Sequence, residues 1–258
     1  MVHNKNPKIK NMKNILSILI LSMIVIGCVG GTPEEHFEKG VQAFQKGDTL
    51  AAIGEFQKTI KLKPDFAAAY FNLGICYSTP ENREKAIENF SQAVKYRTNY
   101  TDAIIALSQA YARTEKFARA IETLKKGLAG NPNQSSLYSN MAYCFLNMPA
   151  IDSAIVYYKK AYQMDSCSAD ISYNLAYAMT DPKYSDESIR YLRRAILCDD
   201  QKMEAHYLLG SRLAAKKNRT PMETSEAIKS LERYLESGQG GLVQVDLANK
   251  KIKELKGK

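Results

Sequence analysis

Apolar residues in this chain fall into short stripes with the spacing of an α-helix, and the stripes come in pairs. The clearest pair consists of Tyr70, Leu73, Gly74 and Tyr77 on one stripe and Ala86, Phe90 and Ala93 on the next. Between them, residues 78–82 read Ser-Thr-Pro-Glu-Asn, which is typical of a turn. Each pair of stripes therefore predicts two amphipathic helices joined by a turn.

The pairs of stripes repeat every 34 residues. A small residue recurs at this step, at Gly40, Gly74, Ser108, Ala142, Ala176 and Gly210. Three further series keep the step: a large apolar residue (Leu73, Leu107, Met141, Leu175, Leu209), a second small residue (Ala86, Ala120, Ala154, Ser188) and a second large residue (Phe90, Leu124, Tyr158, Leu192). Four series in one phase predict about six copies of a single unit, and such arrays present an extended surface to other molecules.

The unit resembles the tetratricopeptide repeat, whose pattern places a large apolar residue, Leu-Gly and Tyr on the first helix and Ala, an aromatic residue and Ala on the second. The resemblance covers roughly residues 33–236. It implies an all-α fold, a right-handed α-solenoid of about six helix-turn-helix repeats in residues 33–240. A C-terminal capping helix is expected in residues 241–258, where it would cover the apolar side of the last repeat.

Three places depart from the strict pattern or end it. The first unit has Lys39 where the others have a large apolar residue. The sixth unit reaches its Ala227 about five residues late, which predicts an enlarged turn at residues 216–221. The capping helix is predicted from the apolar residues Val245, Leu247, Ala248, Ile252 and Leu255.

The N-terminus has the features of an export signal. Lysines precede an apolar run over residues 15–26, which is too short to span a bilayer as a helix and is followed by Gly27 and Cys28. The small residue directly before the cysteine resembles the lipobox of bacterial lipoproteins. The resemblance implies a signal peptide in residues 1–27, lipidation of Cys28, and a flexible, lipidated linker in residues 28–32.

Acyl chains on the cysteine would attach the protein stably to a bacterial membrane. The resemblance points to the outer membrane, with the repeats facing the periplasm, because Val29 rather than Asp follows the cysteine. A plain secretory signal and an N-terminal membrane helix are the alternatives. Whether translation starts at Met1 or at Met12 is open, because Lys13 alone would supply a short basic region before the apolar run.

Charge and motifs narrow the function. The formal net charge is +9, but the first 27 residues contribute +4 and the remaining +5 is spread without a basic run. Because nucleic-acid-binding proteins usually carry a clustered basic stripe, no nucleic-acid partner is expected. The sequence has no phosphate loop, nucleophile elbow, HExxH motif or Cys/His spacing of a metal site. We therefore expect neither enzymatic activity nor a cofactor or metal.

Four cysteines lie within the repeats. Cys76 and Cys144 occupy equivalent places two units apart, so they are too distant to pair and are interpreted as small buried residues. Cys167 and Cys198 lie near the ends of the second helices of adjacent units. Whether these two form a disulfide is open at this point.

In the tetratricopeptide family the first helix of each repeat lines a concave groove, and this implies a set of partner-binding residues. Asparagine recurs two places before the small residue, at Asn72, Asn140 and Asn174, where an amide can both donate to and accept from a peptide backbone. Tyrosines gather on the groove stripe in the C-terminal half, at Tyr143, Tyr173, Tyr177 and Tyr207. Only Arg113 is a candidate cation for a carboxylate. In the alternative interpretation, these side chains satisfy contacts between helices and fill gaps.

Together these features predict a membrane-anchored protein–protein interaction scaffold of the bacterial cell envelope. It would bind a peptide or helix of another envelope protein in its groove. In architecture it resembles the six-repeat lipoproteins that pilot pilus secretins and the repeat lipoproteins of the outer-membrane barrel assembly machine. The alternative function is an accessory protein whose tyrosines stack on carbohydrate or peptidoglycan, and a homo-oligomer is also left open.

Overall fold

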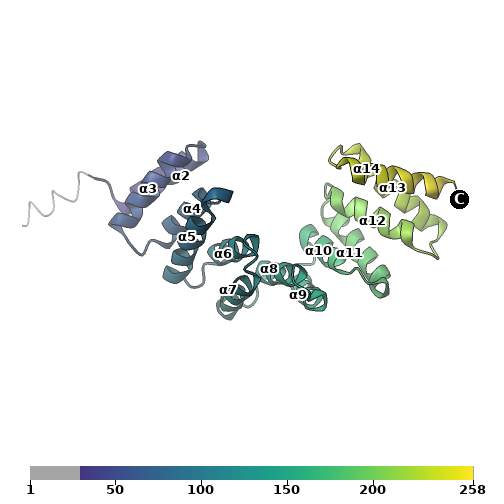
Figure 1. Ribbon diagram of the computed structural model, residues 1–258, viewed down its shortest axis with the longest axis horizontal. Coiled ribbons are helices and arrows are strands. Elements are labelled where there is room, and N and C mark those ends of the chain that lie inside the picture. Colours follow the sequence, from purple (N-terminus) through teal and green to yellow (C-terminus); the bar gives the residue numbers. More distant parts are fainter. Residues whose placement is uncertain (1–29, 258) are drawn as a thin grey trace, which may run out of the picture. The chain divides into compact units, whose positions relative to one another are not determined.

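The computed structural model describes residues 30–257, and this part of the chain forms thirteen α-helices, two short 3-10 helices and no strand. Twelve of the α-helices come in six pairs: α2 (Pro33–Gln45) with α3 (Thr49–Leu62), α4 (Ala67–Cys76) with α5 (Arg83–Tyr96), α6 (Thr101–Arg113) with α7 (Phe117–Gly130), α8 (Ser135–Leu146) with α9 (Ile151–Met164), α10 (Ala169–Ala178) with α11 (Ser185–Cys198), and α12 (Met203–Ala215) with α13 (Pro221–Glu236). The last helix is α14 (Leu242–Lys256) (Figure 1). The all-α class, the six helix pairs and the terminal helix are as predicted.

The chain divides into two compact units. One ends at Thr98 and contains the first two repeats, α2 to α5. The other begins at Asn99 and contains the remaining four repeats and α14. Within each unit every helix packs against the next one along the chain. This consecutive packing is what an α-solenoid requires, because each repeat buries its apolar faces only against its neighbours.

The small residue of each repeat permits close contact between its two helices. A Cβ atom on Gly40 would lie 2.6 Å from the Phe56 ring, and one on Gly74 would lie 2.6 Å from the Phe90 ring. Real Cβ atoms do not approach carbon this closely, so only glycine fits without a shift of the packing. The first repeat therefore packs like the second, although Lys39 breaks its sequence pattern.

The late Ala227 of the sixth repeat comes only partly from its turn. Residues 216–220 separate α12 from α13, which is more than the residues 114–116 between α6 and α7 but fewer than the residues 77–82 between α4 and α5. The rest of the delay arises because α13 begins further ahead of Ala227 than α7 does of Ala120.

α12 ends at Ala215 and α13 begins at Pro221. Thr220 caps α13: its hydroxyl accepts from the Glu223 amide, while the Glu223 carboxylate accepts from the Thr220 amide. This reciprocal capping box fixes where the helix begins after the irregular turn.

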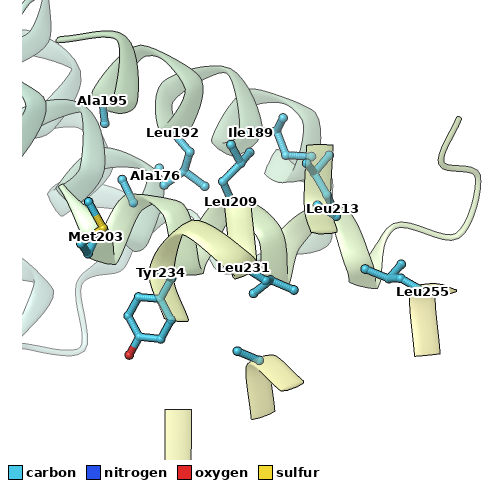
Figure 2. Close-up of a cluster of buried hydrophobic side chains, with 13 residues drawn as sticks. Ala176, Ile189, Leu192, Ala195, Met203, Leu209, Leu213, Leu231, Tyr234 and Leu255 are labelled. Atoms are coloured by element: carbon cyan, nitrogen blue, oxygen red, sulfur yellow. The ribbon is translucent and has the colours of Figure 1, made fainter. Parts of the chain in front are cut away.

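The terminal helix α14 covers the last repeat. Its Ala248 and Leu255 are buried in one cluster with Leu209, Leu213 and Leu231 of α12 and α13 (Figure 2). Ile252 is partly buried against the same cluster. Leu247, which was expected on the apolar stripe, is instead 42% exposed, because its position in the helix turns it away from that cluster.

The described chain begins in contact with the first repeat. Thr32 caps α2 and forms a capping box with Glu35. The buried His36 places Nε2 against the carbonyl oxygen of Gly30 and Nδ1 against the carboxylate of Glu55 on α3. The last residues of the expected linker are therefore held against α2, whereas the sequence suggested a flexible segment.

The signal peptide predicted for residues 1–27 and the lipidation site predicted at Cys28 lie outside the described residues. Among residues 30–257, no helix is both long enough and apolar enough to cross a bilayer.

Candidate binding groove

A pocket of about 430 Å³ opens along the first helices of the third, fourth and fifth repeats. We call it the Asn140 pocket. It is lined by Gln109, Ala112 and Arg113 of α6, Ser139, Asn140 and Tyr143 of α8, Tyr158 of α9, and Asp170 and Asn174 of α10. All of these residues belong to the unit that begins at Asn99. The pocket lies on the helix face that the repeat spacing assigned to the groove.

The Asn140 pocket brings together three of the predicted partner-binding residues, Asn140, Tyr143 and Asn174. They come from equivalent turns of α8 and α10, since the 34-residue step places the same face of each first helix toward the groove. The predicted cation Arg113 also lines it.

The two asparagines of the pocket differ in their hydrogen bonds. Asn140 donates from Nδ2 to the carbonyl oxygen of Ser136 at 2.9 Å, and its Oδ1 accepts from Gln109 Nε2 at 3.1 Å. The second bond links α6 to α8, which is the helix-to-helix role that the sequence left open. The half-buried Asn174 has no hydrogen-bond partner among residues 30–257, so both its donor and acceptor groups are available to a ligand.

Tyr158 contributes a hydroxyl group to the pocket. Its side chain is 1% exposed and packs in the cluster with Ala142, Ile155 and Leu175. The hydroxyl has no hydrogen-bond partner within the described chain. Burial raises the pKa of Tyr158, so the group stays a neutral donor and acceptor. The hydroxyl lines the pocket, so a bound molecule can supply the hydrogen-bond partner that the described chain does not.

Of the two charged side chains that line the pocket, one is paired within the described chain and one is not. Arg113 is exposed and forms no ion pair or hydrogen bond with residues 30–257. Asp170 is paired with Lys202 Nζ at 2.6 Å, and the same ammonium group lies 5.5 Å from the centre of the Tyr173 ring. The positive charge of Arg113 is therefore the one left uncompensated in this region, which favours an acidic group on a bound molecule.

The four predicted tyrosines fall into two classes. Tyr143 and Tyr177, one place after the small residue, are 49% and 52% exposed. Tyr173 and Tyr207, three places before it, are partly buried against the cluster of the fifth and sixth repeats. Tyr207 also contacts Tyr234 of α13, with ring centres 4.9 Å apart. The first class is free for a partner, whereas the second mainly fills gaps between helices.

The structure does not gather the remaining predicted residues in this pocket. Tyr173, Tyr177 and Tyr207 lie outside its lining, although the Tyr173 and Tyr177 rings contact each other at 6.1 Å. Asn72 belongs to the unit that ends at Thr98 and donates to the carbonyl oxygen of Ala68 at 2.9 Å. Its hydrogen bond repeats that of Asn140, so this arrangement is a local feature of the first helices.

Sequence reasoning missed Tyr158 because it belongs to the series of second large residues, which predicts a core position. The same series contained the signal: its other members are Phe90, Leu124 and Leu192, and only Tyr158 carries a polar atom. A tyrosine at a core position has a hydroxyl group that needs a hydrogen-bond partner, and this need could have marked Tyr158 as a candidate binding residue. Among residues 30–257, no group of three or more His, Cys, Asp or Glu is placed to hold a metal ion.

Comparison with known proteins agrees with this architecture. Two family models described as tetratricopeptide repeat match residues 37–100 and 80–142. Over these residues the chain matches the tetratricopeptide repeat, as its sequence pattern indicated. No curated protein matches the chain.

Several solved structures share the fold. That of Pseudomonas aeruginosa pilF is 14% identical, with a TM-score of 0.69 over 87% of this chain and 96% of that one. YrrB, described as a tetratricopeptide repeat protein with an unusual peptide-binding site, is 18% identical, with a TM-score of 0.55 over 76% and 97%. The MamA protein is 23% identical, with a TM-score of 0.57 over 67% and 95%. At these identities the likeness is one of fold.

Proposed function

We propose that this protein is an interaction scaffold that binds an extended peptide segment of another cell-envelope protein in the Asn140 pocket. The observation that carries the proposal is the fully buried Tyr158, whose hydroxyl lacks a partner in the described chain and lines an open pocket. Nearby, Asn174 and Arg113 are also unpaired. Polar groups that converge on a pocket without satisfying one another are typical of a binding site.

A peptide fits this set of groups better than a sugar does. The Asn174 amide can donate to a backbone carbonyl and accept from a backbone amide, which is the alternation that an extended chain presents. Arg113 supplies an uncompensated positive charge for an acidic side chain of the peptide. Tyr143 offers a half-exposed ring as an anchor for an apolar one. YrrB, which has the same fold, is described as having a peptide-binding site.

We predict that Tyr143 and Tyr158 determine the affinity for peptides selected on the full chain from a random display library. Tyr143→Ala should raise the dissociation constant roughly 30-fold, because an aromatic anchor that is buried on binding contributes about 2 kcal/mol to the binding free energy. Tyr158→Phe keeps the ring and removes one hydrogen bond, so it should cost about five- to tenfold. Fluorescence anisotropy with a labelled peptide measures both changes.

The matched control is Tyr96→Ala, which removes a ring that is 40% exposed on α5, in the other unit. Its dissociation constant should equal that of the wild type. Equal affinities for all the variants would contradict binding in the Asn140 pocket. If no peptide is selected and glycans bind on an array instead, with loss of binding in Tyr143→Ala, the carbohydrate alternative replaces the peptide proposal.

The membrane anchor is the second part of the proposal, and it rests on the Ile-Gly-Cys sequence that ends at Cys28. Acylation there would place the first repeat near the bilayer, since α2 begins at Pro33 and His36 holds Gly30 against that helix. The array would thus present its groove to partners at the membrane surface, most simply that of the outer membrane facing the periplasm.

We predict that cells fed an alkyne analogue of palmitate label the wild-type chain and do not label Cys28→Ala. The thiol of Cys28 is the acceptor of the diacylglycerol, so its removal abolishes the modification. The control Cys76→Ser changes a buried cysteine of the repeats and should keep the label. Equal labelling of Cys28→Ala and the wild type would refute the anchor without touching the peptide-binding proposal.

A further inference from the structure

Two thiols meet at the junction between the fourth, fifth and sixth repeats. Cys167 lies in the turn between α9 and α10 and is exposed, and Cys198 is the last residue of α11 and is partly buried. They are 31 residues apart in the sequence, and their sulfur atoms are 3.1 Å apart. The two cysteines are therefore close enough to pair, and whether they form a disulfide depends on their oxidation.

The backbone around both cysteines is held in place by hydrogen bonds. Arg194 Nε donates to the carbonyl oxygen of Ser166 at 2.9 Å, and the Cys167 amide donates to Asp165 Oδ1 at 3.2 Å. Ser168 Oγ caps α10 by accepting from the Ile171 amide at 3.2 Å. A disulfide of about 2.05 Å needs a further approach of about 1 Å, which side-chain rotation can supply.

We propose that Cys167 and Cys198 form a reversible disulfide by exchange with a low-molecular-weight disulfide such as oxidised glutathione. The bond joins the turn before α10 to the end of α11. It thereby fixes the start of the helix that carries Asp170 and Asn174 of the Asn140 pocket. The disulfide is independent of what the pocket binds, so either proposal can fail without the other.

The exchange balances in two steps. The Cys167 thiolate attacks one sulfur of the oxidised glutathione, forming a mixed disulfide and releasing one glutathione thiolate. The Cys198 thiolate then attacks the Cys167 sulfur and releases the second. The protein loses two protons and two electrons, and the small disulfide is reduced to two thiols. Exposure assigns the first attack to Cys167, because the partly buried Cys198 is harder for the oxidant to reach.

The two thiols differ in reactivity for the same reason. Burial, followed by the contact with Cys167, raises the pKa of Cys198, while the nearby Arg194 partly opposes this shift. A thiol with a raised pKa is a poor first nucleophile but can resolve a mixed disulfide held next to it. Cys76 and Cys144 are buried, and burial raises the pKa of Cys144 to about 11, so both serve as unreactive internal references.

The test treats the native full chain with oxidised glutathione, blocks the remaining thiols and maps the cysteines by peptide mass spectrometry. The wild type should lose the free thiols of Cys167 and Cys198 and give a peptide in which these two residues are cross-linked. Cys198→Ser should stop at the first step, with a stable glutathione adduct on Cys167. Cys167→Ser should lose the cross-link and react several-fold more slowly at Cys198.

Two results would overturn the proposal. One is a glutathione adduct on Cys167 of the wild type that persists without an internal bond. The other is a wild-type chain in which neither Cys167 nor Cys198 reacts faster than the buried Cys76. Because the readout is the state of each thiol, neither result depends on peptide binding.

Discussion

Replacing Gly210 by alanine is expected to lower the free energy of unfolding of the unit that begins at Asn99 by about 2 to 3 kcal/mol. A Cβ atom at this position would lie 2.6 Å from Leu231 Cγ and 2.9 Å from the carbonyl oxygen of Ala227. The second contact is with backbone, so α12 and α13 must move apart to relieve it. This movement opens the cluster on which α14 packs.

The intrinsic preference of alanine for helices acts in the opposite direction. Alanine is favoured over glycine by about 1 kcal/mol inside a helix. The chain offers a matched control in Gly54 of α3, where an added Cβ meets nothing within 4 Å. Gly54→Ala should therefore show the gain alone and stabilise its own unit by up to about 1 kcal/mol.

Urea unfolding of the full chain, monitored by circular dichroism, measures the change in the free energy of unfolding for both substitutions. The midpoints are compared when the dependence of that free energy on urea concentration is the same in each protein. A Gly210→Ala protein as stable as Gly54→Ala would mean that the sixth repeat, like the fourth and fifth with Ala142 and Ala176, accepts alanine at the small position. It would contradict the clash expected with Leu231 and the Ala227 carbonyl oxygen.

Much of the fold follows from the 34-residue repeat, because a fixed spacing of small and large residues determines which two helices contact each other and where. Gly40 and Gly74 face Phe56 and Phe90 as the pattern requires. The late Ala227 reflects the early start of α13 at Pro221 as well as the turn before it, and the spacing alone does not separate the two. The exposure of Leu247 was not predictable from the same reasoning, since an apolar stripe on a terminal helix does not state how much of that stripe the last repeat covers.

The site was predictable in outline only. Helical spacing assigned Asn140, Tyr143 and Asn174 to one face, and the pocket contains them. Spacing alone treated Tyr173 like Tyr143, yet Tyr173 packs against neighbouring helices while Tyr143 stays half-exposed. That difference depends on which side chains the next repeat places opposite each ring, and a single-helix pattern does not contain this information.

The disulfide between Cys167 and Cys198 should raise the free energy of unfolding of its unit by about 3 to 4 kcal/mol, if the gain is the entropy removed from the unfolded chain. The closed loop spans 31 residues, long enough for a large loss of unfolded-state freedom. In the folded state the bond requires little rearrangement, because Arg194 and Ser168 already fix the adjoining backbone. The gain should therefore not be consumed by strain in the native structure.

Urea unfolding of the same preparation with and without a reducing agent measures this difference. The oxidised chain should unfold at a higher urea concentration, and reduction should return it to the lower midpoint. Cys198→Ser, which lacks the second sulfur, should give one midpoint under both conditions. The same shift in Cys198→Ser would assign the effect to the reducing agent or to another cysteine. A cross-linked wild type without a shift would mean that the unfolded chain already keeps this turn and the end of α11 together, so that the bond records the contact without strengthening it.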